Sequence, residues 1–310
     1  MTKISNLLTR VNSEKRERLA ILALRRAATP HRTSSFQRVY RNLARKIESY
    51  EASRATILYT DSFSDIVIDD FVYFLKEKNY RSSTIRSFCQ KIVTILHVAQ
   101  REGYKVNIQD NLTLPSDEGS KAIYLSLDEL QRLHDMQLKS ENAAICDIFL
   151  IGCFTALRYS DYSKLTRDNL IGNDIVIKTK KTGVVVRIPM HPYVREIFDK
   201  YHYFLPPMKS QQNFNKVIKT ICKRAAITDP VRIERTVGLK IERKNYPKWQ
   251  LVSSHTARRS GATNMYLAGI PVFRIMLITG HKTQESFFRY IRITAEENAT
   301  ILANHPFFKK

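Results

Sequence analysis

Helical periodicity is the feature that most limits what this chain can fold into. Apolar residues recur three and four positions apart through much of the 310-residue sequence, which is the spacing of one face of an α-helix. In the first third of the chain this pattern appears in three runs, 36–47, 67–75 and 85–99. Ser64 precedes the second run as a cap, Ser82 and Ser83 open the third, and Gly103 ends it. These runs predict a small all-helical unit.

A stretch without periodicity divides the chain. Residues 107–121 hold Asp, Asn, Pro, Ser and Gly, and we interpret them as an interdomain linker. We therefore expect a basic N-terminal segment at 1–34, a helical domain at 35–106 and a second domain at 122–310. The length of the chain is enough for two domains with cores of their own.

One segment of the second domain has strand character instead. The β-branched runs 174–178 and 184–188 flank Thr182-Gly183 and predict a hairpin, which Pro189 closes. This hairpin carries Lys180 and Lys181 at its tip. The predicted fold class is therefore mainly α with a small antiparallel β-sheet.

The charge of the chain points to a polyanionic partner. The formal net charge is +22, and phosphate neutralisation with counterion release is what such an excess of Lys and Arg favours. Residues 1–55 carry thirteen basic against four acidic side chains, and 178–248 carry seventeen against five, so both predicted domains are basic. Nucleic acid is the expected partner; charge alone leaves a ribosome-associated or a membrane-surface protein open.

Several other classes lack support in the sequence. The longest apolar stretch, 143–157, carries Asp147 and is shorter than the ~18 residues of a membrane span. The four cysteines show no CxxC spacing, which is typical of reduced thiols in a cytoplasmic protein. No phosphate-binding glycine loop, zinc motif or calcium loop is present. We expect neither a metal nor a cofactor.

Four segments contain residues suited to phosphodiester chemistry. TALRYSD, KTKKTG, SSHTARRS and TGHKTQESFFRYI supply the candidates Arg158, Lys181, His255, Arg258, His281 and Tyr290. Each candidate alone has an ordinary alternative; Tyr290, for example, is one of fifteen tyrosines, and most tyrosines pack. The specificity lies in the complete set.

Together these groups match what cleavage of a phosphodiester needs without a metal. Arg158 and Arg258 offer guanidinium forks for the non-bridging oxygens. Preorganised charge of this kind is commonly the largest catalytic contribution. Tyr290 offers a hydroxyl that can form a covalent intermediate. Lys181, with Lys180 as a second choice, offers a proton for the leaving oxygen.

The order, spacing and local sequence of these residues resemble the tyrosine recombinase (phage integrase) family, from about residue 35 to the end. The resemblance implies that Arg158 and Arg258 bind phosphate, that Lys181 is the hairpin lysine and general acid, and that Tyr290 is the nucleophile. It assigns His255 and His281 to proton transfer and phosphate binding, with Asp161 as a supporting acid. We also expect DNA contacts from residues beside the site: Lys180, Arg259 and Lys282.

The family implies a wider mechanism and architecture. Its members join a helical core-binding (SAM-like) domain to a catalytic domain, and the two close around double-stranded DNA at specific recombination sites. They form a 3′-phosphotyrosyl link, exchange strands through a Holliday junction and need no ATP or metal. Four protomers act together, in some cases with accessory DNA-bending proteins. The tail 291–310 would dock in cis or in trans.

Some features set this chain apart from common family patterns. Ala156 stands where a glycine is frequent, and Lys282 where a small residue is common. The short segment before residue 35 favours a simple recombinase or DNA invertase, similar to those in mobile or invertible DNA of the Bacteroides group. Two alternatives stay open: a type IB topoisomerase, and a DNA-binding architectural protein without catalysis. The sequence does not distinguish integration, excision, inversion and resolution.

Overall fold

The structure is a computed structural model that describes residues 15–107, 114, 122–291, 293, 295–303 and 306–309. Most of the predicted linker 107–121 and the first fourteen residues lie outside the described residues. The chain divides into two compact units, one of residues 1–120 with 233–244, the other of 121–232 with 245–310. Among the described helices, none has the length and apolar character needed to cross a membrane.

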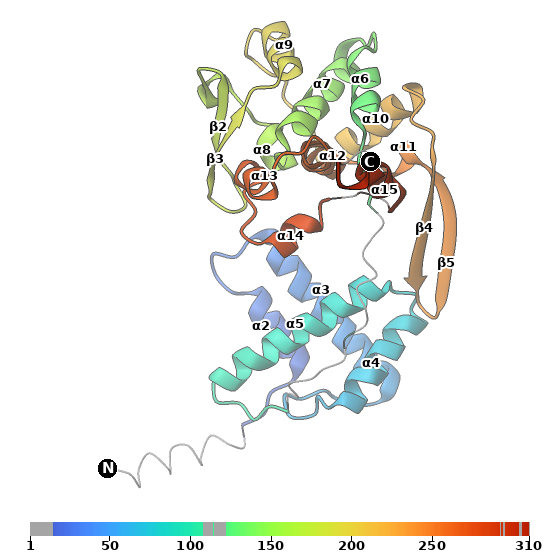
Figure 1. Cartoon of the computed structure of the whole chain (residues 1–310). Coiled ribbons are helices and arrows are strands. Elements are labelled where there is room, and N and C mark those ends of the chain that lie inside the picture. Colours follow the sequence, from blue (N-terminus) through green and yellow to red (C-terminus); the bar gives the residue numbers. More distant parts are fainter. Residues whose placement is uncertain are drawn as a thin grey trace. The chain divides into compact units, whose positions relative to one another are not determined.

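The first unit is a helical bundle (Figure 1). It consists of α2 (Leu19–Ala27), α3 (Ser34–Arg54), α4 (Asp65–Glu77) and α5 (Ser82–Arg101). The three helices predicted from periodicity are present, and the Ser64 side chain caps α4 by accepting from the Val67 amide. Helix α2 was not predicted, because the whole helix is only nine residues long and two arginines interrupt its apolar residues. Leu19 and Ala23 nevertheless lie fully buried in the same core.

Helix α7 (Ser140–Thr155) forms the centre of the second unit (Figure 1). Nearly all of its side chains from Ala144 onward are buried, because neighbouring helices cover it on several sides. The helices packed on it are α6 (Leu127–His134), α8 (Tyr159–Tyr162), α9 (Pro192–Lys200), α10 (Gln211–Arg224) and α12 (Ser254–Leu267). The remaining elements are the short helices α11 (Lys248–Leu251), α13 (Val272–Thr279), α14 (Gln284–Phe288) and α15 (Ala295–Ala303), with 3₁₀ turns at Arg167–Asn169 and Pro306–Phe308.

Two small antiparallel sheets complete the described fold. Strands β1 (Leu170–Ile171), β2 (Asp174–Lys178) and β3 (Val185–Pro189) form one sheet in that order, with Ile175 opposite Ile188. The predicted hairpin is therefore confirmed, although its loop spans residues 179–184 instead of Thr182-Gly183 alone. The second sheet, a ribbon of β4 (Pro230–Val237) and β5 (Lys240–Pro247), was not predicted. The predicted class, mainly α with small antiparallel sheets, is confirmed.

Candidate active site

The candidate site lies where helices α7 and α12 approach each other closely. Ala156 caps the C-terminal end of α7, and its left-handed conformation (φ 52°) turns the chain so that Arg158 directly precedes α8. Helix α12 packs against this corner at Gly261, where a Cβ atom would stand 2.5 Å from the Cys153 carbonyl oxygen. Only glycine permits that approach without a shift, and it brings Arg258 on α12 against the end of α7.

Arg258 is held rigidly although its side chain is only 1% exposed. Its Nη1 donates to the Ala156 carbonyl at 2.9 Å, and its Nη2 donates to the Thr279 carbonyl at 2.8 Å. The same Nη2 lies 3.0 Å from His281 Nε2. The guanidinium thus joins three segments that are far apart in sequence.

The neighbours of His281 assign its tautomer. A guanidinium can only donate, so His281 Nε2 must accept from Arg258, and the ring proton then resides on Nδ1. That proton is directed to Thr279 Oγ1 at 2.8 Å, while the Thr279 hydroxyl donates to the Ile275 carbonyl at 2.8 Å. His281 is therefore neutral and fixed in orientation.

Both site histidines resist protonation. Burial, followed by the charges of Arg258 and Arg158, lowers the pKa of His281 to about 3. Burial, followed by the charge of Arg259 and then of other nearby cations, lowers the pKa of His255 to about 4. The cationic surroundings make a second positive charge costly, so both rings are neutral near pH 7.

Tyr290 lies among these groups. Its ring centroid is 4.8 Å from that of His281 and 5.2 Å from that of His255, and the guanidinium carbon of Arg258 is 5.1 Å from it. The backbone holds the tyrosine just after α14, with its amide donating to the Phe287 carbonyl at 2.8 Å. The Tyr290 ring is thus packed against one guanidinium and two imidazole rings.

The two arginines carry unused hydrogen-bond donors. Arg158 Nη1 and Arg258 Nε are buried and have no hydrogen-bond partner among the described residues. Burial, then the nearby charge of Arg158, lowers the pKa of Arg258 to about 10. Two guanidinium groups that repel one another and keep donors unpaired form a site prepared for an anion.

The β2–β3 hairpin is tied to the same centre. The Lys180 amide donates to Asp161 Oδ1 at 3.0 Å, and Thr179 Oγ1 pairs with Thr182 Oγ1 at 2.8 Å. A Cβ on Gly280 would lie 3.8 Å from Thr182 Oγ1, so the loop before His281 touches the hairpin. Lys181 follows the tethered residue with an exposed side chain.

Five of the six predicted residues thus meet in one place: Arg158, His255, Arg258, His281 and Tyr290. The hairpin of Lys181 is fastened beside them through Asp161. Of the three expected DNA contacts, Lys180 and Lys282 are exposed and Arg259 is half-buried. Sequence reasoning missed Thr279 and Gly261; a glycine inside a helical pattern was the available signal for the second.

The described side chains around the site do not include a set of metal ligands. Within the described part of the chain, no three His, Cys, Asp or Glu side chains are grouped so that they could hold a metal ion. The charges at the site are those of Arg, Lys and one buried carboxylate, Asp161, which is 3% exposed.

Several solved structures have a similar fold. The integrase of transposon Tn1549 (aa 82–397) in complex with circular intermediate DNA has a TM-score of 0.64 at 17% identity, over 92% of this chain and 99% of that one. A lambda integrase dimer bound to a COC′ core site has a TM-score of 0.64 at 15% identity, over 93% and 81%. XerH recombinase bound to a palindromic difH substrate gives 0.63 at 14%, over 86% and 79%.

The sequence comparisons are decisive about the family. No curated protein matches this chain significantly. The model of the phage integrase family, in contrast, matches residues 124–297, which is more than half of the chain and includes all four segments of the candidate site. The chain belongs to the phage integrase family.

Proposed function

We propose that this protein is a site-specific tyrosine recombinase that cuts and rejoins duplex DNA through a covalent phosphotyrosine. One observation carries the proposal: half-buried Arg158 and buried Arg258 each keep a buried donor unpaired. Arg258 lies beside the ring of Tyr290, which also contacts the two neutral imidazoles. The oxygens of a phosphodiester would accept hydrogen bonds from these unpaired donors, and the Tyr290 hydroxyl would be the nearest nucleophile.

The chemical step assigns a role to each group. Tyr290 Oη attacks phosphorus, forming the 3′-phosphotyrosyl bond while the bond to the 5′-oxygen breaks. Arg158 and Arg258 hold the non-bridging oxygens as charge develops on them. Lys181 gives a proton to the leaving 5′-oxygen, and neutral His255 takes the phenolic proton.

His281 serves through Arg258. Because its Nε2 already accepts from the guanidinium, it fixes the direction of the phosphate donors instead of taking the phenolic proton. Rejoining is the reverse reaction, in which a 5′-hydroxyl attacks the phosphotyrosine and the phenol leaves. The bond energy is kept in the covalent link, so the cycle needs no nucleotide cofactor.

The architecture supports a wider role on DNA. Tn1549 integrase, lambda integrase and XerH are proteins of similar fold in complex with DNA, and two basic regions in this chain fit the same polyanion. We propose that the helices within 35–106 and the cations Lys180, Arg259 and Lys282 contact duplex DNA. Four protomers on paired sites, docking of the 291–310 tail and help from DNA-bending proteins belong to the same proposal.

The decisive experiment traps the covalent intermediate. The protein is mixed with randomly nicked fragments of its host genome, because a nick lets the short cleaved end diffuse away. Protein-linked DNA is recovered after denaturation and sequenced. Wild type should yield adducts at one repeated sequence, and Tyr290→Phe should yield none.

A matched control separates chemistry from folding. Tyr266→Phe also removes a tyrosine hydroxyl, but from a partly exposed side chain on α12, so it should form adducts as wild type does. Scattered adducts would indicate a topoisomerase. Adducts from Tyr290→Phe, or none from wild type that binds DNA, would refute the proposed reaction.

A further inference from the structure

The β4–β5 ribbon is an element that the active site does not use. Its two strands form a sheet of their own, and the first six residues of β5 are all exposed. Successive side chains of a strand point to opposite faces, so six exposed residues in a row leave both faces of β5 open to solvent. Such a ribbon adds little to a hydrophobic core, and stability does not explain its length.

The ribbon is nonetheless held in a defined position. An isolated two-stranded hairpin is at best marginally stable in water. Here the turn is fixed to the helical unit: the Gly238 amide donates to the Tyr80 carbonyl at 3.0 Å, and Val237 pairs with Arg81. The turn belongs to the same compact unit as α4 and α5.

Gly238 makes this attachment possible in two ways. Its φ of +60° at the first position of a two-residue hairpin turn is a conformation that favours glycine. In addition, a Cβ atom there would stand 2.6 Å from the Lys76 carbonyl oxygen and 2.9 Å from Asn79 Oδ1. An alanine could not fit without displacing backbone, so the attachment depends on this residue.

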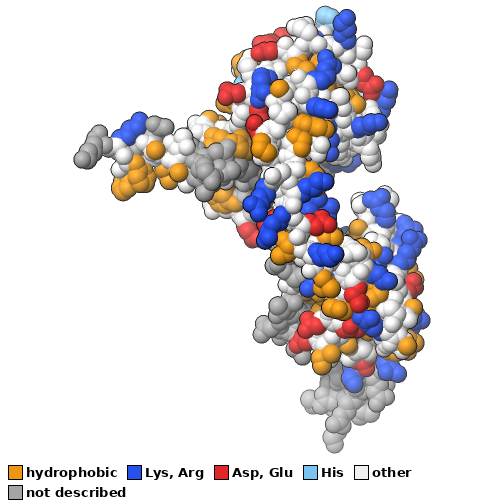
Figure 2. All heavy atoms as spheres, turned by 90° about the vertical axis from the view of Figure 1, so that its right-hand side faces the viewer, with side chains coloured by type: hydrophobic (Ala, Val, Ile, Leu, Met, Phe, Trp, Pro, Cys, Tyr) orange, Lys and Arg blue, Asp and Glu red, His pale blue; other side chains and the backbone are white. Residues whose placement is uncertain are grey.

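The charge of the ribbon is unbalanced towards the basic. Residues 230–247 contain five Lys/Arg against two Glu, a net +3. On β5, Lys240, Arg243 and Lys244 are all exposed. Arg243 also pairs with Glu234 of β4 at 3.0 Å. Figure 2 views the molecule from the side on which Figure 1 draws the ribbon, and it shows exposed Lys and Arg side chains on that face.

We propose that the β4–β5 ribbon is a DNA-contacting arm, separate from the site at Tyr290, in which Lys240 and Lys244 bind phosphates. The major groove of B-form DNA admits a two-stranded ribbon, and basic side chains on such a ribbon reach the flanking phosphates. Fixing the turn through Gly238 removes part of the entropy cost of placing these side chains. The identity of the partner rests on the proposed function.

The test measures binding of a fluorescent duplex of random sequence over a range of salt concentrations. Each phosphate contact contributes about 0.9 to the slope of log affinity against log salt. Lys240→Gln/Lys244→Gln should therefore reduce that slope by about 2 and weaken binding roughly 30-fold at about 0.15 M salt. Glu242→Gln, which removes an opposing charge from the same strand, should tighten binding.

Two controls make the result specific. Lys139→Gln/Lys209→Gln removes the same charge from exposed positions elsewhere and should leave the slope unchanged. Gly238→Ala should weaken binding without any change of charge. Gly172→Ala, at an equally left-handed turn (φ +61°) with nothing within 4 Å of the added methyl, should not.

The binding and adduct experiments distinguish failure of the proposed DNA contact from failure of the proposed cleavage reaction at Tyr290. If the two double variants lose affinity equally, or if neither changes the slope, the ribbon is not a DNA contact, whatever happens at Tyr290. If wild type forms no covalent adduct but the ribbon variants still change the salt slope as expected, the proposed reaction fails and the DNA-contacting arm stands.

Discussion

At the scale of single residues, the site is set by hydrogen bonds that no sequence pattern reveals. Arg258 donates to a carbonyl 102 positions earlier in the chain, and the His281 tautomer depends on that guanidinium. The type and order of these residues identified them as candidates. Their protonation states follow only from the burial and the neighbouring charges that the fold creates.

Thr279 is the residue at which this dependence can be tested. Thr279→Val keeps the shape but removes the partner of His281 Nδ1, so the ring loses one of the two hydrogen bonds that fix its orientation. Loss of one such hydrogen bond costs about 1 kcal/mol, which corresponds to roughly 5-fold slower strand cleavage. Thr279→Ser keeps the hydroxyl and should cleave at nearly the wild-type rate. Equal rates for all three proteins would contradict the role of this hydrogen bond.

The site histidines also predict how the stability of the DNA-free protein depends on pH. Their folded-state pKa values of about 4 and about 3 lie below the ordinary value of about 6.5. The unfolded chain therefore binds more protons below about pH 6.5, and the free energy of unfolding falls as the pH decreases towards 4. The slope is at most about 1.4 kcal/mol per pH unit for each histidine.

Thermal unfolding between pH 7 and pH 5 measures this effect while most carboxylates stay ionised. His255→Gln/His281→Gln removes both titrating groups, so its unfolding temperature should change less with pH than that of wild type. Parallel curves for the two proteins would show that these histidines do not titrate as their surroundings indicate.

At the scale of elements, the structure shows which helices and strands could be predicted from sequence patterns. Helices α3, α4 and α5 were predicted because one face of each is apolar at the helical period. The β2–β3 hairpin was predicted because two β-branched runs flank a Thr-Gly turn. The β4–β5 ribbon was missed because its outer strand has no buried face and therefore no alternation. Helix α2 was missed because nine residues are too few for a clear period.

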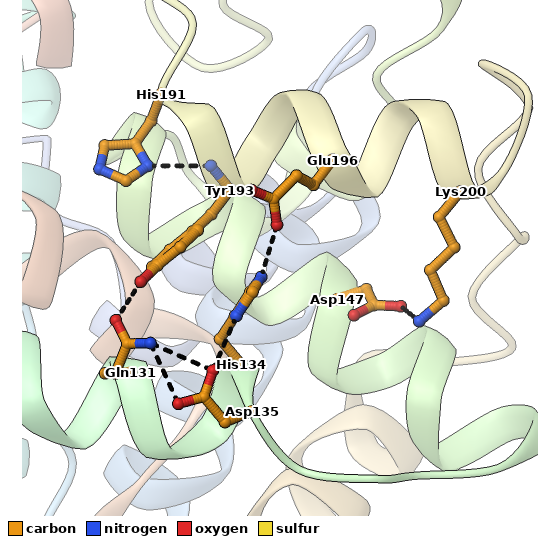
Figure 3. Close-up of polar contacts among 8 residues, drawn as sticks. All are labelled: Gln131, His134, Asp135, Asp147, His191, Tyr193, Glu196 and Lys200. Carbon is orange, nitrogen blue, oxygen red and sulfur yellow. Dashed lines mark hydrogen bonds and ion pairs between the residues drawn. The ribbon is translucent and has the colours of Figure 1, made fainter.

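Other contacts between elements hold the second unit together without touching the site. Figure 3 shows α6 and α9 joined by His134 Nε2 to Glu196 Oε2 at 3.0 Å, by the bond between Tyr193 and Gln131, and by the stacked rings of His134 and Tyr193. Lys200 of α9 reaches Asp147 of α7 at 2.6 Å. Such pairs lie on residues with no apolar pattern, so they could not be predicted from periodicity.

The hairpin of Lys181 provides a prediction at this scale. Asp161→Ala removes the acceptor of the Lys180 amide, so the hairpin should move more freely and deliver its proton less often. We expect about 10-fold slower cleavage with unchanged DNA affinity, as the loss of a hydrogen bond to a charged acceptor implies. Asp161→Asn keeps an oxygen for the amide and should lose less.

A modified substrate separates this effect from a general loss of structure. A 5′-bridging sulfur leaves as a thiolate and needs little help from an acid. If Asp161 acts through Lys181, that substrate should restore the cleavage rate of Asp161→Ala. A rate that stays low with the sulfur substrate would mean that the carboxylate supports the arginines or the tyrosine instead.

At the scale of the whole molecule, the net charge of +22 and the separate cores determine how the protein responds to salt. Without DNA, like charges repel in the compact state, and added salt screens them, so the unfolding temperature should rise as salt increases. With duplex DNA present, added salt weakens the complex and removes the stabilisation that binding provides, so the unfolding temperature should fall. Calorimetry across one salt series, with and without duplex, measures both trends. Trends of the same sign would show that phosphate neutralisation is not what balances this charge.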